Sequence, residues 1–235
     1  MLTLVNEYTS DLFGLFYPSI CLACSKKLLK GEEIICFRCI SEMPQTGYWK
    51  DSNNKLMNRF TGRVELQSAV AFFHFKKEGI VQHLLHQLKY RKRKDVGEYL
   101  GKMFGAKLKE ESDVLQHIDL IVPVPLHWKK LKTRGYNQCD PFAQGLSDTT
   151  QIPWSSTALV RQHENISQTK KKRFDRWGNV AEIFAVSDEK QLTGKHILLV
   201  DDVVTTGATS EACLQTILKV PETKVSFAAI AAASR

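Results

Sequence analysis

The sequence predicts an α/β fold in which helices flank a mostly parallel sheet. Short runs such as "KHILLVDD" at 195–202 and "KVSFAAIAAAS" at 224–234 are largely apolar, which is typical of strands buried on both faces. These runs alternate with segments whose apolar residues recur at helical spacing, and that alternation favours parallel strands joined by helices. The length of 235 residues allows one substantial core with a small appendage.

The individual elements follow from composition and period. The run at 66–75 is rich in Val, Ala and Phe, as strands are, whereas Val81, Leu84 and Leu88 share one face of a helix. Pro141 must lie in the first turn of its helix. We expect strands at 66–75, 117–125, 156–160, 182–186, 195–202 and 224–234, and helices at 79–90, 96–109, 136–146 and 208–220. Residues 41–62 are expected to form a connector with short elements.

The N-terminal segment is expected to form an amphipathic helix, because Leu4, Tyr8 and Leu12 recur near helical spacing. A helix lying on a membrane surface is the alternative, but its polar face carries none of the usual cations. No apolar run approaches the ~20 residues of a membrane span, so we expect a cytoplasmic protein. The division we expect is an N-terminal helix with a cysteine module at 1–50 and a larger domain at 60–235.

Four of the six cysteines form two Cys-x2-Cys pairs, Cys21 with Cys24 and Cys36 with Cys39. Two such pairs complete a tetrahedral metal site, and in a reducing cytosol zinc is a better account of them than two disulfides. Four sulfur ligands leave no position for water, so the sequence predicts a structural zinc ribbon. Cys139 and Cys213 have no such partners and are expected to be buried as small apolar residues.

Two adjacent acids, Asp201 and Asp202, end the run "HILLVDD" and are followed by "VVTTGAT". Ligands of an open parallel sheet bind outside the carboxyl ends of its strands. Gly207 allows a positive φ, and the main-chain amides and hydroxyls of Thr205 to Thr209 at a helix N-terminus suit a phosphate. The carboxylates suit a cis-diol. The pattern therefore indicates a ribose 5-phosphate ligand; the alternative is a helix cap beside two surface acids.

These residues resemble a known signature. "ILLVDDVVTTGAT" (197–209) is similar to the signature of the phosphoribosyltransferase superfamily, whose members bind 5-phosphoribosyl-1-diphosphate. The four-cysteine module, "VPVPLHWKKLKTRGYNQ" (122–138) and "QTKKKRFDRWGNV" (168–180) resemble the ComF family of competence proteins. This resemblance covers essentially the whole chain and implies a type I phosphoribosyltransferase-like fold.

The resemblance also implies roles for particular residues. Asp201 and Asp202 would bind the ribose hydroxyls, and Val124 and Pro125 lie where the superfamily keeps its pyrophosphate-binding loop. Residues 161–179 correspond to a mobile lid, in which Arg173 would face the diphosphate, with magnesium as the accompanying ion. The 5-phosphate would be held by Thr205, Thr206, Gly207, Ala208 and Thr209. The superfamily also contains regulators that bind the ligand without turnover, so catalysis stays an open alternative: transfer of the phosphoribosyl group to an unidentified base or amine.

Positive charge is in excess, with 33 Lys and Arg against 25 Asp and Glu, which suits a polyanion or a phosphorylated ligand but also serves solubility. Cations interleaved with aromatic residues suit single-stranded nucleic acid. The candidates of this kind are Lys89, Tyr90, Arg91, Lys92, Arg93, Arg134 and Tyr136. A solvated surface or a diphosphate clamp is the alternative. The ComF resemblance implies a role in DNA uptake and natural transformation, with single-stranded DNA, an uptake helicase and recombination mediators as partners.

Overall fold

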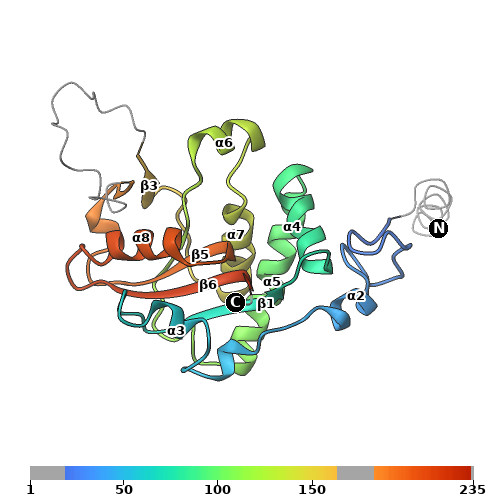
Figure 1. Ribbon diagram of the computed structural model, residues 1–235, viewed down its shortest axis with the longest axis horizontal. Helices are drawn as coiled ribbons and strands as arrows, with labels where there is room; N and C mark the ends of the chain where they lie inside the picture. Colours follow the sequence, from blue (N-terminus) through green and yellow to red (C-terminus); the bar gives the residue numbers. More distant parts are fainter. Residues whose placement is uncertain (1–18, 163–182, 234–235) are drawn as a thin grey trace, which may run out of the picture.

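The computed structural model describes residues 19–162 and 183–233. Its main sheet has four parallel strands in the order β1-β6-β5-β2, of which Figure 1 labels β1, β6 and β5. The strands are β1 Ala69–Phe75, β2 Leu120–Pro123, β5 His196–Val204 and β6 Lys224–Ala233, and the helices of four or more residues are α2 Phe37–Glu42, α3 Met57–Phe60, α4 Ile80–Tyr90, α5 Lys94–Glu111, α6 Trp128–Arg134, α7 Cys139–Thr150 and α8 Ala208–Ile217. The predicted fold class is confirmed.

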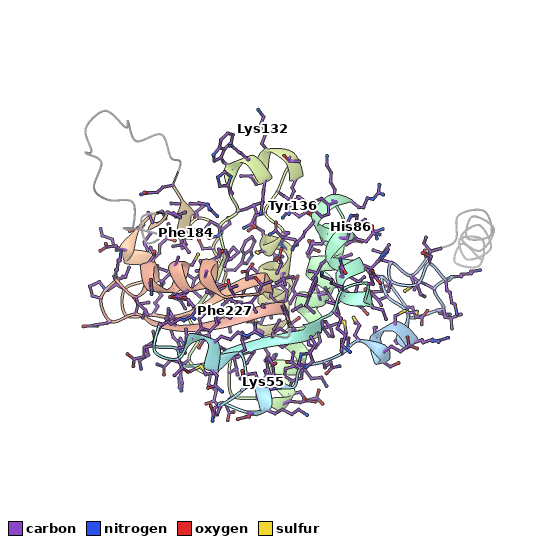
Figure 2. All side chains as sticks on the ribbon, in the orientation of Figure 1. Lys55, His86, Lys132, Tyr136, Phe184 and Phe227 are labelled. Carbon is purple, nitrogen blue, oxygen red and sulfur yellow. The ribbon has the colours of Figure 1, made fainter. Side chains whose placement is uncertain are left out.

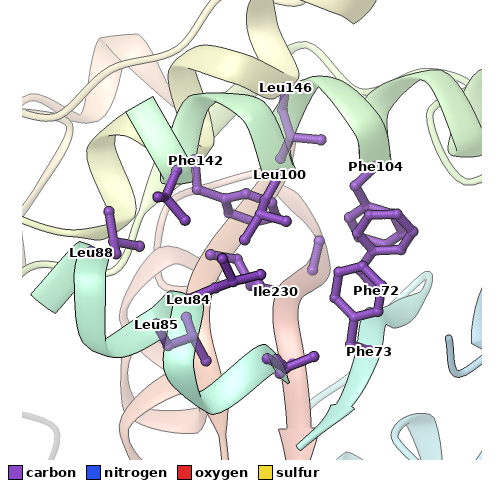
Figure 3. Close-up of a cluster of buried hydrophobic side chains, with 14 of the residues drawn as sticks. Phe72, Phe73, Leu84, Leu85, Leu88, Leu100, Phe104, Phe142, Leu146 and Ile230 are labelled. Carbon is purple, nitrogen blue, oxygen red and sulfur yellow. The ribbon is translucent and has the colours of Figure 1, made fainter. Parts of the chain in front are cut away.

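Alternate residues of each strand pack on opposite faces of this sheet, as the period of a strand requires. On one face, Phe72 and Ile230 contact the apolar sides of α4, α5 and α7 (Figure 3). The rings of Phe72 and Phe104 stack there with centroids 4.7 Å apart. On the other face, Ala71 and Phe227 belong to a second cluster that includes residues of α3 and α8. The sheet is therefore covered on both sides, which explains its nearly continuous apolar strands.

Several elements differ from the sequence-based expectation. The strands expected at 156–160 and 182–186 are shorter in the structure, β3 Leu159–Arg161 and β4 Phe184–Val186, and they pair antiparallel in a separate two-stranded sheet. Helix α6 was not predicted, because its residues include none that are buried and so show no apolar stripe. The single-turn elements η1 Tyr48–Lys50 and η3 Glu189–Gln191 complete the described structure. The predicted N-terminal helix lies outside the described residues.

The cysteine module lies at one end of the molecule, where α2 is found in Figure 1. Its main chain turns back on itself through an isolated bridge between Ile20 and Lys27. Cys21 and Cys36 belong to the same apolar cluster as the α4, α5 and α7 face of the sheet. Trp49 extends this contact: its ring packs against Phe104, and its indole N–H donates to Glu111 Oε2 at 2.9 Å.

Candidate functional site

The two acids lie inside β5 rather than at its end, because the strand continues to Val204. Asp201 is aligned with Ala229 of β6, so the ladder fixes its main chain. One oxygen from each carboxylate and the Cys139 thiol lie within 4.8 Å of one another. The prediction that the strand stops at the acids is therefore corrected. Val203 and Val204 are also aligned with β6, so the strand continues for two more residues.

Asp201 is held by three donors. Its Oδ1 accepts from the Asp202 main-chain N–H at 2.8 Å, and its Oδ2 accepts from the Ser210 hydroxyl at 3.2 Å. The Cys139 thiol lies 3.6 Å from Oδ1. Burial and, next, the charge of Asp202 raise the pKa of Asp201 to about 7. Near neutral pH this carboxyl therefore exchanges its proton, and a cation brought beside it would favour the ionised form.

Asp202 is paired with a lysine from a distant element. The Lys89 ammonium, on the last turn of α4, lies 2.9 Å from Asp202 Oδ2, and the two side chains are 21% and 8% exposed. This oxygen is buried and accepts no hydrogen bond from the described residues, so the ion pair is its one polar contact there. Lys89, which the sequence pattern grouped with nucleic-acid candidates, is therefore directed toward the acids.

Thr205–Thr209, named here the hydroxyl loop, follows β5 and includes the first two residues of α8. Gly207 has φ 85°, the left-handed conformation expected for it, and a side chain there would meet the Phe60 ring at 3.3 Å. Thr205, Thr206, Ala208 and Thr209 are exposed. The Thr206 hydroxyl accepts from the Ala208 N–H at 3.3 Å. The loop thus presents exposed threonine residues at the N-terminus of α8, a geometry suited to an anion.

The acids line a cavity of about 210 Å³, the acidic-pair pocket. It brings together residues that are far apart in sequence, from α4, the segment after β2, α6, the start of α7, β3, β5 and the start of α8. Its lining includes Lys89, Val124, Pro125, His127, Lys130, Arg134, Gln138, Cys139, Arg161, Asp201, Asp202 and Thr209. Four cations therefore share one small space with two carboxylates. Val124 and Pro125 lie beside the acids, whereas Thr205 to Ala208 of the hydroxyl loop do not line this cavity.

Helix α6 supplies two of these cations and projects from the top of the molecule, where Figure 2 labels Lys132. His127 caps the N-terminus of the helix, its Nδ1 accepting from the Lys129 N–H at 3.2 Å, and Gly135 caps the C-terminus with φ 80°. Arg134 donates to Gln138 Oε1 at 2.5 Å. Sequence reasoning missed His127 and Gln138. The sequence signal for both residues was that they lie within 122–138, a segment that resembles the ComF family.

The nucleic-acid candidates divide between surface and interior. Tyr90 is 62% exposed, and the Arg134 guanidinium carbon lies 5.3 Å from its ring centroid. Arg91 and Lys92 are exposed beside it. Arg93 is instead bound to Asp95, with Nη2 2.6 Å from Oδ2.

Tyr136 corrects the prediction of a base-stacking ring. It is 8% exposed, and its hydroxyl donates to the Leu88 carbonyl. Desolvation of the phenol raises its pKa. The ring is covered by protein and packs in the core, so it presents no face to a base.

The four N-terminal cysteines could hold a metal ion, since one sulfur from each lies within 4.8 Å of the others. The Cys24 and Cys36 sulfurs are 3.8 Å apart, which is the edge of a tetrahedron with metal–sulfur distances of about 2.3 Å. The main-chain N–H groups of Ala23 and Cys36 donate to Cys21 Sγ at 3.4 and 3.3 Å. Burial raises the pKa of Cys21, but these and other donors outweigh it and lower that pKa to about 7. Arg173 and most of the predicted lid lie outside the described residues.

Comparison with known proteins agrees with this geometry. Residues 138–235 match the phosphoribosyl transferase domain family. The chain is 33% identical over 138 residues to the DNA utilization protein YhgH of Escherichia coli strain K12, an alignment covering 58% of this chain and 60% of that protein. It is 35% identical over 92 residues to competence protein F of Haemophilus influenzae, covering 39% and 40%. The predicted resemblance to phosphoribosyl transferase domains and to competence proteins is confirmed.

Among solved structures, the allosteric regulatory enzyme of purine biosynthesis matches with a TM-score of 0.42 and 19% identity, over 62% of this chain and 30% of that one. The aligned region thus spans less than two thirds of these relatives' own lengths. No helix among residues 19–162 and 183–233 combines the length and the apolar character that crossing a membrane requires.

Proposed function

We propose that the protein binds 5-phosphoribosyl-1-diphosphate with magnesium and acts in DNA utilization in the cytoplasm, where it handles single-stranded DNA. One observation carries the ligand. Two adjacent acids of β5 share a pocket with four cations and adjoin a loop of exposed hydroxyls at a helix N-terminus. Acids suit a diol, the loop suits a phosphate monoester, and the cations suit a diphosphate. The relatives named for DNA utilization and competence support the cellular role.

In this proposal each group of residues has one task. Asp201 and Asp202 accept hydrogen bonds from the ribose hydroxyls, and the hydroxyl loop holds the 5-phosphate. Lys130, Arg134 and Arg161 face the diphosphate. Magnesium, when bound, would offset diphosphate charge beside the carboxylates. For a hydroxyl to reach Asp202 Oδ2, the Lys89 ammonium must move from its position at 2.9 Å, so ligand binding includes breaking this ion pair. Arg173 would add a cation from the lid.

Calorimetry with 5-phosphoribosyl-1-diphosphate and magnesium tests the site. Asp201→Asn/Asp202→Asn should weaken binding by at least about 100-fold, because two charged acceptors are lost and each is worth about 1.5 kcal/mol or more. The matched control, Glu110→Gln/Glu222→Gln, removes the same charge from two exposed acids and should bind like the wild type. Equal binding by the acid variant and the wild type would contradict the site.

The same preparations separate binding from transfer. Release of pyrophosphate with any of a panel of bases and amines, absent in the acid variant, would establish an active transferase. If no compound in the panel causes pyrophosphate release while ligand binding is intact, the protein binds the ligand without transferring the phosphoribosyl group. The intact acid pair and adjoining hydroxyl loop are what favour the catalytic alternative.

Single-stranded DNA binding rests on the surface formed by Tyr90, Arg91 and Lys92 with the cations of α6. Stacking on Tyr90 and phosphate contacts from its neighbours predict that Tyr90→Ala/Arg91→Ala/Lys92→Ala weakens binding of a thymidine oligonucleotide by at least about tenfold and lowers the salt slope by about 1 to 2. Filter binding at several salt concentrations measures both quantities. Lys190→Ala/Lys219→Ala, which removes two exposed cations elsewhere, is the control. An unchanged salt slope in the triple variant would contradict DNA binding at this surface.

An uptake helicase and recombination mediators are the protein partners that we propose.

We propose that the metal of the four-cysteine module is zinc, with residues 1–50 as a structural unit beside the domain at 60–235. The purified protein should contain about one zinc ion per chain, because four thiolates at these distances satisfy its tetrahedral preference. Cys24→Ser should lose most of that metal, measured by mass spectrometry of the acid-released ion. Cys213→Ala, which removes a buried thiol outside the cluster, should keep it. Equal metal content in both variants would contradict the assignment.

A further inference from the structure

A second cationic pocket lies on the other side of the hydroxyl loop. Its cavity is about 420 Å³, twice that of the acidic-pair pocket. Its wall includes Tyr48, Lys55, Arg59, Arg63, His74 and Thr206. We call it the Arg59 pocket. Figure 2 shows Lys55 near the bottom of the molecule and Lys132 of α6 at the top, so this pocket lies far from the α6 cations in this view.

Topology explains why the loop separates two pockets. His74 belongs to β1, at one edge of the sheet, whereas Val124 of the acidic-pair pocket follows β2, at the opposite edge. The hydroxyl loop leaves β5 between those edges. Thr206 faces the Arg59 pocket and Thr209 faces the acidic-pair pocket. One loop can therefore offer hydroxyls to ligands on both of its sides.

The Arg59 pocket is positive and its lining contains no carboxylate. Lys55 and Arg59 form no ion pair with any acid in the described part of the chain, and Arg63 is held 3.3 Å from Glu211 in an exposed contact. Burial, then Lys55 and Lys76, lower the pKa of His74, which agrees with positive charge gathered around it. Exposed pairs such as Arg63 with Glu211 contribute little energy, so Arg63 can turn to a ligand.

Arg59 is fixed in place by neutral acceptors. Its Nη1 donates to the Thr205 carbonyl at 2.9 Å, and its Nη2 donates to the carbonyl of Ala233 at the end of β6. Carbonyl groups orient a guanidinium without neutralising it. The pocket therefore has a pre-positioned cation, two adaptable cations and a threonine hydroxyl, which together match the acceptor oxygens of a phosphate.

We propose that the Arg59 pocket binds the phosphate group of a second phosphorylated ligand, distinct from the one in the acidic-pair pocket. Its volume falls within the range of small-molecule sites, roughly 300 to 1,000 Å³, and exceeds what a lone phosphate ion fills. Two sources present such a phosphate: a free nucleotide and the backbone of a nucleic-acid strand.

Calorimetry of the zinc-loaded full chain with inorganic diphosphate, without magnesium, tests the pocket. The wild type should bind two ions per chain. Lys55→Ala/Arg63→Ala should lose one of them, with affinity at that site reduced at least about tenfold, and Lys130→Ala/Arg134→Ala should lose the other. Lys190→Ala/Lys219→Ala should keep both. A single bound ion that Lys55→Ala/Arg63→Ala leaves unchanged and Lys130→Ala/Arg134→Ala abolishes would overturn this proposal but leave the proposed function standing.

Two further probes identify the source of the phosphate. If Lys55→Ala/Arg63→Ala weakens the binding of AMP at least about tenfold and leaves the binding of a thymidine oligonucleotide unchanged, the ligand is a free nucleotide. If the double variant binds the oligonucleotide more weakly and its salt slope is lower by about 1 to 2, the phosphate belongs to a nucleic-acid strand. Binding of diphosphate, AMP and oligonucleotide all equal to the wild type would refute the site.

Discussion

Lys89→Met should lower the free energy of unfolding by about 3 kcal/mol, the lower end of what breaking a buried ion pair costs. The substitution keeps most of the side chain's volume but leaves Asp202, whose side chain is 8% exposed, without its cation at 2.9 Å. Denaturant unfolding of the zinc-loaded protein measures the change.

The pH dependence of this loss has a definite sign. Burial and then the charge of Asp202 raise the pKa of Asp201 to about 7, and the charge of Lys89 opposes this increase. In Lys89→Met the folded state keeps the Asp201 proton to higher pH than the wild type does. Folded protein that binds more protons loses more stability as pH rises. The difference between the two proteins should therefore grow as pH increases above about 7.

A double-mutant cycle distinguishes a broken ion pair from general damage to α4. Asp202→Asn leaves a neutral amide beside a lysine that is 21% exposed and can stay hydrated, so it should cost only about 1 kcal/mol. Lys89→Met/Asp202→Asn should be more stable than Lys89→Met, since no buried charge remains unpaired. A double variant whose loss equals the sum of the two single losses would show that the side chains do not interact.

Gly145→Ala is expected to destabilise the protein by about 3 kcal/mol or more, the upper end of overpacking costs. Gly145 lies on α7 against α5, and an added Cβ would fall 2.1 Å from the Glu98 carbonyl oxygen and 2.8 Å from its carbon. These are main-chain atoms inside a helix, so a side-chain rotation cannot relieve the contact and the two helices must separate.

The matched control for Gly145→Ala is Gly105→Ala on the facing helix. Its Cβ would meet the Thr149 Cβ at 3.1 Å and the Thr150 Cγ2 at 3.4 Å, which are side-chain atoms. Alanine gains about 1 kcal/mol over glycine in a helix interior, which offsets much of this milder crowding. Chemical denaturation should place Gly105→Ala within about 1 kcal/mol of the wild type. Equal losses in both variants would contradict close helix contact as the cause.

Sequence reasoning found the strands of the main sheet because their apolar residues are nearly continuous, and it found α4 and α5 because each has one apolar face. Helix α6 has no buried residue, so its sequence lacks the longer series of apolar residues at helical spacing by which a packed helix is predicted. The parallel order of the strands followed from alternation with helices, but the pairing of β3 with β4 in a second sheet depends on tertiary packing of two strands of three residues each.

The candidate site was predictable where its residues are neighbours in sequence. Asp201, Asp202 and the hydroxyl loop form one continuous motif. The partner of Asp202 is 113 positions away, at Lys89, and nothing local distinguishes that lysine from the exposed cations that follow it. Tyr136 illustrates the same limit. An aromatic residue beside cations suits base stacking by pattern alone, and burial against α4, with its hydroxyl on the Leu88 carbonyl, decides otherwise.

The position of the acids within β5 has a consequence for the thermodynamics of ligand binding. Ladder partners in β6 stand beside Asp201, Val203 and Val204, so the main chain that carries the carboxylates loses its conformational entropy when the protein folds. When the proposed ribose diol binds these carboxylates, the main chain that carries them is already ordered, and the conformational entropy still to be lost is confined to side chains and to the turn after Val204. Binding at this end of the ligand should accordingly be driven by enthalpy.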